Sequence, residues 1–270
     1  MQSKRPIALR RQTLRRQSIY LLPNLFTLAA LFSGFYAIVQ SMNKMFVPAA
    51  VAIFIAMILD GLDGRVARLT RTQSAFGAEF DSLSDMVSFG VAPALVVYEW
   101  ALREFGKVGW MVAFVYCAGA ALRLARFNTN IETGDKRWFQ GLPSPSAAAL
   151  VAGLVWISHE YADELSSISD ALPFFALLLT LFAGLTMVSN VRFWSFKEIN
   201  MRKTVPFVAL LVMVLLLMLI VAKPPLVLFC LFLAYGASGY VMALWQLLRR
   251  GKKSVERQNN GSNGHGNGQN

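Results

Sequence analysis

Residues 58–85 read ILDGLDGRVARLTRTQSAFGAEFDSLSD and place four aspartates in a chain that is otherwise mostly apolar. Side chains three or four residues apart share one face of a helix. Asp60 and Asp63 have this spacing, and Asp81 and Asp85 repeat it further along. The stretch therefore predicts two helices that each direct two carboxylates toward one point.

Long apolar runs lie on both sides of this stretch. The chain is 56% hydrophobic and 15% charged, which is more apolar than a soluble domain. A helix needs roughly 20 apolar residues to cross a bilayer. Runs of this kind lie at 20–40, 46–64, 83–101, 108–127, 144–159, 171–189, 205–222 and 225–248. We expect an all-α, polytopic integral membrane bundle of about eight spans, or seven if the short fifth run does not cross.

The distribution of charge predicts the orientation of these spans. If the N-terminus is cytoplasmic, the far side holds only four of the 26 basic residues, namely Lys44, Arg103, Lys107 and Lys223. Cytoplasmic loops carry the excess of Lys and Arg. The far loop between the fifth and sixth spans carries acids and no Lys or Arg. We therefore expect the four aspartates and both termini to face the cytoplasm.

The formal net charge of +11 also bears on partners. The basic residues lie at helix ends and in short loops rather than on a folded face, which argues against nucleic acid and favours anionic membrane lipids. The patterns divide the chain into four parts: a basic cytoplasmic segment at 1–19, a catalytic membrane domain at 20–189, a C-terminal transmembrane hairpin at 190–250 and a disordered cytoplasmic tail at 251–270. We expect an interfacial amphipathic helix in the first part, with a plain basic tail as the alternative.

Carboxylates at membrane depth are costly unless they are paired or coordinated. Four converging carboxylates repel one another without a cation, and Mg²⁺ or Mn²⁺ takes oxygen ligands while bridging to a substrate phosphate. Gly61, Gly64 and Gly77 leave room for a ligand to approach the backbone. The stretch therefore indicates a divalent metal site that holds a phosphate.

Two other interpretations of the aspartates stay open, and a third fails. The aspartates could pair with nearby arginines in a solvated loop, or they could line the site of a cation transporter. A calcium loop of the EF-hand kind fails because Leu62 and Gly64 occupy ligand positions and Arg71 replaces the final glutamate.

Eight positions over 26 residues have the spacing of a known signature. They are Asp60, Asp63, Gly64, Ala67, Arg68, Gly77, Asp81 and Asp85. This pattern resembles the CDP-alcohol phosphatidyltransferase family, with no position departing from it. The stretches 21–34, 79–94, 121–128 and 141–149 resemble the bacterial phosphatidylserine synthase branch of that family.

The resemblance implies a helical enzyme of the cytoplasmic (inner) membrane, commonly a homodimer, with two divalent ions (Mg²⁺ or Mn²⁺). It implies transfer of the phosphatidyl group of CDP-diacylglycerol to the hydroxyl of L-serine, with release of CMP. Asp60, Asp63, Asp81 and Asp85 would hold the ions, and Asp85 would also be the catalytic base. The residues that would bind CDP-diacylglycerol are Asn24, Thr27, Gly64, Ala67, Arg68, Ser74 and Gly77.

Arg123, Arg126 and Asn128 lie near the cytoplasmic end of the expected fourth span. An arginine fork fits a carboxylate, and serine carries one, so these residues are candidates for binding serine. The two arginines could instead be membrane anchors or phosphate ligands. Glycerol 3-phosphate, inositol or choline are the alternative acceptors within the family.

Overall fold

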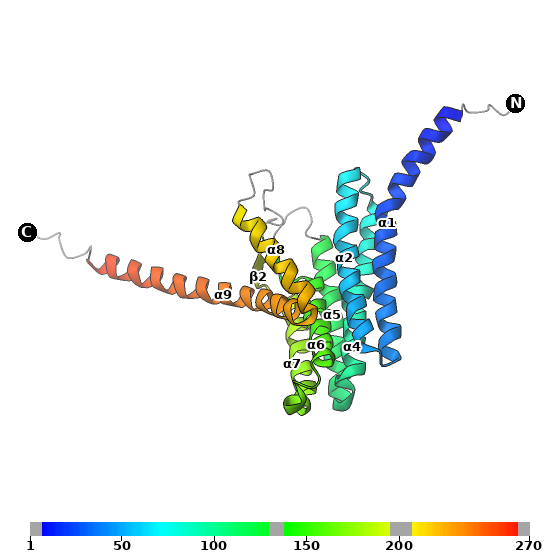
Figure 1. Ribbon diagram of the computed structural model, residues 1–270. Helices are drawn as coiled ribbons and strands as arrows, with labels where there is room; N and C mark the ends of the chain where they lie inside the picture. The colour runs from blue at the N-terminus through cyan, green and yellow to red at the C-terminus, as the bar shows by residue number, and fades with distance from the viewer. Residues whose placement is uncertain (1–6, 130–137, 195–206, 264–270) are drawn as a thin grey trace, which may run out of the picture.

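The computed structural model describes residues 7–129, 138–194 and 207–263. These residues form a helical bundle with one small antiparallel ribbon (Figure 1). The helices are α1 (Ile7–Met42), α2 (Phe46–Thr70), α3 (Ala75–Asp85), the π-helix η1 (Met86–Val91), α4 (Ala92–Trp100), the 3₁₀-helix η2 (Leu102–Phe105), α5 (Lys107–Thr129), α6 (Ser144–Glu160), the 3₁₀-helix η3 (Ser166–Ala171), α7 (Leu172–Val188), α8 (Phe207–Ala222) and α9 (Pro224–Asn263). Strands β1 (Trp138–Gln140) and β2 (Arg192–Trp194) form the ribbon.

Among the described residues, six helical segments are long and apolar enough to cross a membrane. They are Leu22–Met42, Phe46–Thr70, Ala75–Trp100, Lys107–Thr129, Ser166–Val188 and Pro224–Trp245. Helices α6 and α8 are shorter, with 17 and 16 residues. The all-α, polytopic integral membrane class is therefore confirmed, whereas the count of eight spans stays a prediction.

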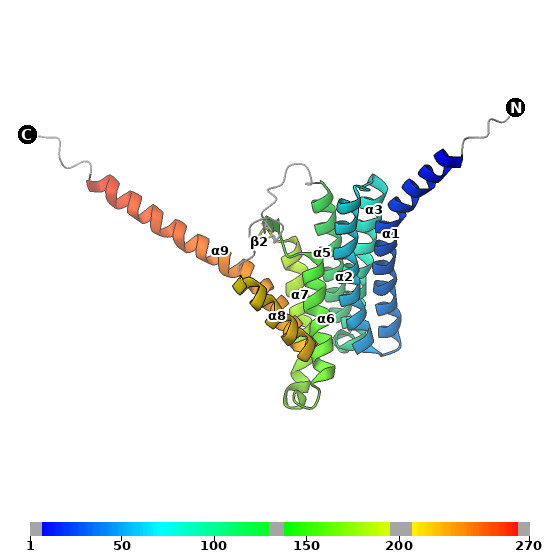
Figure 2. The same cartoon turned by 45° about the horizontal axis from the view of Figure 1, so that its top comes forward.

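Helices α1, α2, α5, α6 and α7 run alongside one another, while α8 and α9 form an oblique hairpin (Figures 1 and 2). Helix α9 packs on α6, and Phe229 from α9 lies in the same buried cluster as Leu150 and Leu154. The C-terminal end of α2 and the N-terminal part of α1 lie at one end of the bundle, and η3 lies at the other (Figure 1). The parts of α2 and α3 that carry the four aspartates thus lie toward the end of the bundle where the N-terminal part of α1 is found.

Helix α3 continues without a break through η1 into α4. The wider π-helical turn lies directly after Asp85, and two hydroxyl groups from within the bundle hold it. The Tyr116 hydroxyl donates to the Phe89 carbonyl (3.0 Å), and the Ser88 hydroxyl donates to the Ala30 carbonyl (3.0 Å). Such π-helical turns are frequent at functional sites. Buried contacts therefore fix the backbone at the end of the aspartate helix.

Close contact between α1 and η1 depends on a glycine. A Cβ placed on Gly34 would lie 2.5 Å from Ser88 Oγ and 2.7 Å from its Cα. Real Cβ atoms essentially never make such contacts, so any side chain at this position would push the two segments apart. The position of η1, and with it the end of α3, depends on this approach.

The described residues at both ends of the chain are helical. Helix α1 is continuous from Ile7 into the first span, so residues 7–19 are helical, and their interfacial location stays a prediction. Helix α9 runs to Asn263 and occupies much of the segment 251–270, where disorder was expected. Residues 264–270 lie outside the described residues. The expected domain boundary at residue 189 also stays a prediction. Contacts cross this boundary, because β2 pairs with β1 and α9 packs on α6.

Candidate active site

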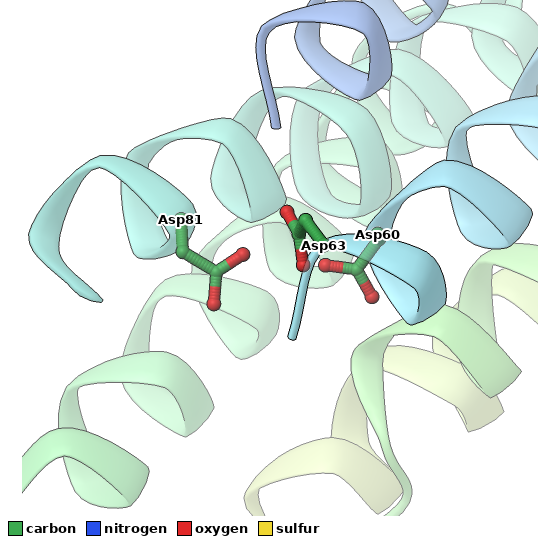
Figure 3. A group of neighbouring side chains, drawn as sticks. All are labelled: Asp60, Asp63 and Asp81. Atoms are coloured by element: carbon green, nitrogen blue, oxygen red, sulfur yellow. The ribbon is translucent and has the colours of Figure 1, made fainter. Parts of the chain in front are cut away.

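The carboxylates of Asp60, Asp63 and Asp81 converge between α2 and α3 (Figure 3). One carboxylate oxygen from each lies within 4.8 Å of the others. Asp85 is the last residue of α3, one helical turn after Asp81. The helical spacing had predicted that two pairs from two helices converge, and the structure brings Asp60, Asp63 and Asp81 together. The place of Asp85 in the metal site stays a prediction.

Thr27 of α1 supports the most buried aspartate. Its Oγ1 donates a hydrogen bond to Asp63 Oδ2 (2.6 Å), and both side chains are buried. Ser84 of α3 donates in turn to the Thr27 carbonyl (3.1 Å). These two bonds tie α1, α2 and α3 together at the cluster. The Thr27 hydroxyl, expected to contact the nucleotide, is bonded to Asp63 in the structure.

The cluster has the donor set that a hard divalent cation requires. Every ligand atom is a carboxylate oxygen, which suits Mg²⁺ or Mn²⁺. Asp81 Oδ1 is buried and lacks a hydrogen-bond partner among the described residues. A buried carboxylate oxygen without a hydrogen-bond partner destabilises the fold, and a bound cation would remove this cost by coordinating the oxygen. The residues present therefore fit a metal site.

The ion pairs argue against a loop in which the acids pair with arginines. Among the described residues, the ion pairs join Glu99 of α4 to Lys44 (2.6 Å), which lies between α1 and α2, and to Arg103 of η2 (3.0 Å). Neither pair involves the aspartate cluster. The three arginines that follow the first aspartate pair are exposed.

The turn between α2 and α3 brings several expected nucleotide residues beside the cluster. Ser74 caps α3, and its Oγ accepts a hydrogen bond from the Gly77 amide (3.0 Å). A Cβ on Gly77 would lie 3.1 Å from Ser74 Oγ and 3.4 Å from Asn24 Oδ1. Asn24, Ser74 and Gly77 are therefore neighbours, although Asn24 comes from α1.

The remaining expected nucleotide residues lie on the last two turns of α2. The Arg68 guanidinium folds back along the helix, so that a Cβ on Gly64 would lie 3.5 Å from Arg68 Nη1. The Ala67 carbonyl accepts hydrogen bonds from the backbone at Arg71 and Thr72, which ends the helix. The Arg68 side chain is exposed and free to turn toward a bound anion.

Only one of the two expected acceptor arginines lies close to the aspartates. The Arg123 side chain interacts electrostatically with Asp85, and its Nη1 donates to Ser144 Oγ at the start of α6 (2.8 Å). Arg126 instead donates to Asn190 Oδ1 after α7 (3.3 Å). Arg126 thus has a partner on the segment after α7, and its role as a serine ligand stays a prediction.

Asn128 is connected to the cluster indirectly. Its Nδ2 donates to Ser82 Oγ (3.0 Å), and Ser82 directly follows Asp81 in α3. The end of α5 is thus tied to the aspartate helix. Sequence reasoning missed Ser82, Ser84 and Ser144, because an isolated serine in an apolar helix gives no signal of which partner it will meet.

The fold and the site define an α-helical integral membrane protein with an oxygen-ligand cation centre where α2 and α3 converge. Residues 20–182 match the family model for CDP-alcohol phosphatidyltransferase. A Helicobacter pylori protein named CDP-diacylglycerol–serine O-phosphatidyltransferase is 38% identical over 241 residues, which cover 88% of this chain and 98% of the relative. This chain belongs to the CDP-alcohol phosphatidyltransferase family, as the signature residues had indicated.

More distant relatives carry the same name. The Saccharomyces cerevisiae protein is 39% identical over 157 residues, covering 53% of this chain and 54% of the relative. The Methanocaldococcus jannaschii protein is 38% identical over 141 residues, covering 52% of this chain and 61% of the relative. The similarity in these organisms is therefore to about half of the chain.

Proposed function

We propose that this chain transfers the phosphatidyl group of CDP-diacylglycerol to the hydroxyl of L-serine, giving phosphatidylserine and CMP. The observation that carries the proposal is the convergence of Asp60, Asp63 and Asp81, each of which offers one carboxylate oxygen within 4.8 Å of the others. Its support from the comparisons is a relative of that name that aligns with 88% of the chain.

Asp60, Asp63, Asp81 and Asp85 would hold two divalent ions, Mg²⁺ or Mn²⁺. When bound, such ions neutralise the diphosphate and orient the leaving CMP. Thr27 fixes the orientation of Asp63 through a buried hydrogen bond. A ligand with such support keeps its geometry while substrates exchange.

Asn24, Ser74 and Gly77 lie on one side of the cluster and would bind the CDP moiety together with Gly64, Ala67, Arg68 and Thr27. The exposed Arg68 supplies positive charge near the diphosphate, and the small glycines allow the phosphates to approach the backbone. This set places the nucleotide over the turn between α2 and α3. The lipid part of the substrate would then extend along the apolar helices.

The serine hydroxyl would meet Asp85 and the serine carboxylate would meet Arg123. A hydroxyl is a poor nucleophile until a positioned base removes its proton, and Asp85 would be that base. Arg123 lies beside Asp85 and would bind the carboxylate, with Arg126 and Asn128 supporting the end of α5. Serine is the one acceptor among the alternatives considered that has a carboxylate, which favours it over glycerol 3-phosphate, inositol and choline.

The proposal extends to the setting of the enzyme. The site and both termini would face the cytoplasm at the cytoplasmic (inner) membrane, since the basic residues collect on that side. Residues 20–189 would form the catalytic domain, 190–250 a hairpin attached to it, and two chains would form a homodimer. Anionic lipids would contact the basic residues at the helix ends.

The direct test is CMP release by the purified protein from CDP-diacylglycerol with Mn²⁺ and one acceptor at a time. L-serine should support release, whereas glycerol 3-phosphate, inositol and choline should not. Asp81→Asn should abolish release, and Glu79→Gln, which changes an exposed acid on the same helix, should retain it. Release with another acceptor would reassign the substrate, and no release with any acceptor would favour the transporter alternative.

A further inference from the structure

The Arg123 guanidinium reaches the start of α6 and keeps unused donors there. Its Nη1 donates to Ser144 Oγ (2.8 Å), whereas Nε is buried and has no hydrogen-bond partner in the part of the chain that the structure describes. A guanidinium carries five N–H groups in a rigid planar fork. Because a buried N–H group without an acceptor destabilises the fold, this part of the fork is suited to an anionic ligand.

Two hydrogen bonds define how α5 lies against the aspartate helix. Asn128, near the end of α5, donates to Ser82 Oγ of α3 (3.0 Å). Tyr116, in the middle of α5, donates to the Phe89 carbonyl of η1 (3.0 Å). The later residue of α5 thus pairs with the earlier residue of the continuous α3–η1 segment. The two segments are therefore antiparallel between these contacts.

Arg123 and Asp85 both lie between the two contacts. Arg123 comes five residues before the α5 contact at Asn128, and Asp85 comes three residues after the α3 contact at Ser82. Arg123 also follows Tyr116 by seven residues, which is about two helical turns, so the two side chains share the face of α5 that packs on η1. Arg123 and Asp85 are consequently on facing elements at about the same depth in the bundle.

The segment before α6 holds Ser144 in a fixed position. The Leu142 amide donates to the Thr186 carbonyl of α7 (3.1 Å). Gly141 has a φ of 77°, and a Cβ there would lie 2.2 Å from the Met187 carbonyl oxygen, so the segment lies directly against the end of α7. Ser144 follows as the first residue of α6 and is fully buried. A group on such a rigid element positions a neighbour better than a group on a free loop.

On the basis of the proposed function, we propose that Ser144 is a positioning residue for the acceptor. Its hydroxyl oxygen accepts from Arg123 Nη1 and fixes the orientation of the fork, so that the remaining N–H groups face the serine carboxylate while Asp85 faces the serine hydroxyl. Because Ser144 is fully buried, it acts through Arg123 rather than on the acceptor itself. The start of α6 thus contributes to the choice of an alcohol that carries a carboxylate.

Ser144→Ala tests this role because it removes the oxygen that accepts from Arg123 and keeps a residue that favours the helix. The KM for L-serine should rise about tenfold, as for the loss of one hydrogen bond to a charged group. The kcat and the Kd for CDP-diacylglycerol should change less than about twofold, since the interaction concerns only acceptor binding. Weaker binding of CDP-diacylglycerol with an unchanged KM for serine would overturn the proposal, because the fork would then hold a phosphate.

Ser158→Ala is the matched control. Ser158 lies near the other end of α6, is also buried, and donates to the Leu154 carbonyl (2.8 Å). This variant loses a buried, hydrogen-bonded hydroxyl from the same helix and should keep the wild-type KM for serine. An equal rise of the KM in both variants would overturn the proposal, because the loss of any buried hydroxyl from α6 would then suffice.

A double-mutant cycle tests whether Ser144 acts through Arg123. In an Arg123→Lys background the planar fork is already lost, so Ser144→Ala should raise the KM for serine by less than about twofold. A tenfold rise in both backgrounds would overturn the proposal, because the effect of Ser144 would then be independent of Arg123.

The proposed function and this inference fail in different ways. If the wild-type protein releases no CMP with serine, the proposed function fails. If the wild-type protein is active with serine and Ser144→Ala keeps the wild-type KM, only the role of Ser144 is refuted.

Discussion

Thr27→Val removes a single hydroxyl from the aspartate cluster and changes the side-chain shape little. Thr27 Oγ1 donates to Asp63 Oδ2 at 2.6 Å, and the two residues are only 3% and 5% exposed. Water therefore has little access to replace the lost donor. A hydrogen bond to a charged group contributes about 1.5 to 3 kcal/mol. The substitution leaves Asp63 without the contact that orients it.

The expected effect is on metal affinity. Loss of a contact that orients a metal ligand typically weakens binding by about 10- to 100-fold, which equals about 1.4 to 2.8 kcal/mol and agrees with the loss of one such bond. The Mn²⁺ concentration for half-maximal CMP release should therefore rise by about this factor. Direct Mn²⁺ binding, followed by the electron paramagnetic resonance of the free ion, should shift in parallel without any substrate present.

Thr180→Val is the matched control. Thr180 is also buried, and its hydroxyl donates within α7 to the Ala176 carbonyl (2.7 Å), so the same group is lost outside the cluster. This variant should bind Mn²⁺ as the wild type does. Equal metal affinities in Thr27→Val and the wild type would refute the supporting role of Thr27. Equal losses in both threonine variants would point to a general loss of stability.

Three further predictions follow from the site, the packing and the charge distribution. Asp85→Asn should keep CDP-diacylglycerol binding while turnover falls by about 10²- to 10⁴-fold, the loss typical of a general base; normal turnover would remove it from the mechanism. Gly34→Ala should lower the free energy of unfolding in detergent by about 1 to 3 kcal/mol through overpacking, whereas Gly61→Ala, with no atom within 4 Å of the new Cβ, should not lower it. In a cysteine-free background, a cysteine at Asp163 should react with an impermeant thiol reagent outside intact cells and one within 130–137 should be protected; the reverse would contradict the orientation.

The sequence predicted the main geometry of the site because the helical repeat fixes which side chains share a face. Asp60 and Asp63 on α2 and Asp81 on α3 converge as their spacing required. The same rule cannot show which neighbouring helix supplies support. Thr27 lies 36 residues before Asp63, and their hydrogen bond depends on how α1 packs against α2.

Other features depend on tertiary contacts that a linear pattern does not contain. The π-helical turn after Asp85 departs from the regular repeat, and partners on α1 and α5 hold it through Ser88 and Tyr116. Arg123 and Arg126 share the spacing of one helix face, yet Ser144 binds one and Asn190 binds the other. Spacing on one helix could not distinguish these partners.

Apolar content predicted the membrane class but not the arrangement of the C-terminal hairpin. Helices α8 and α9 have the apolar sequence of spans, and α9 packs against both α6 and β2. The tail after Arg250 is polar and low in complexity, which predicted disorder, whereas α9 continues through it to Asn263. The sequence therefore located the reacting groups better than the elements that surround them.

The measurement that tests the central claim most directly follows CMP and phosphatidylserine together in one preparation of the purified protein. With CDP-diacylglycerol and L-serine, the two products should form in equal amounts, stop when a chelator is added and resume when Mn²⁺ is restored. Asp81→Asn should form neither product, and Glu79→Gln should form both. Equal product formation with the chelator present, or by Asp81→Asn, would contradict the assignment of the aspartate cluster as the metal-dependent centre of phosphatidyl transfer.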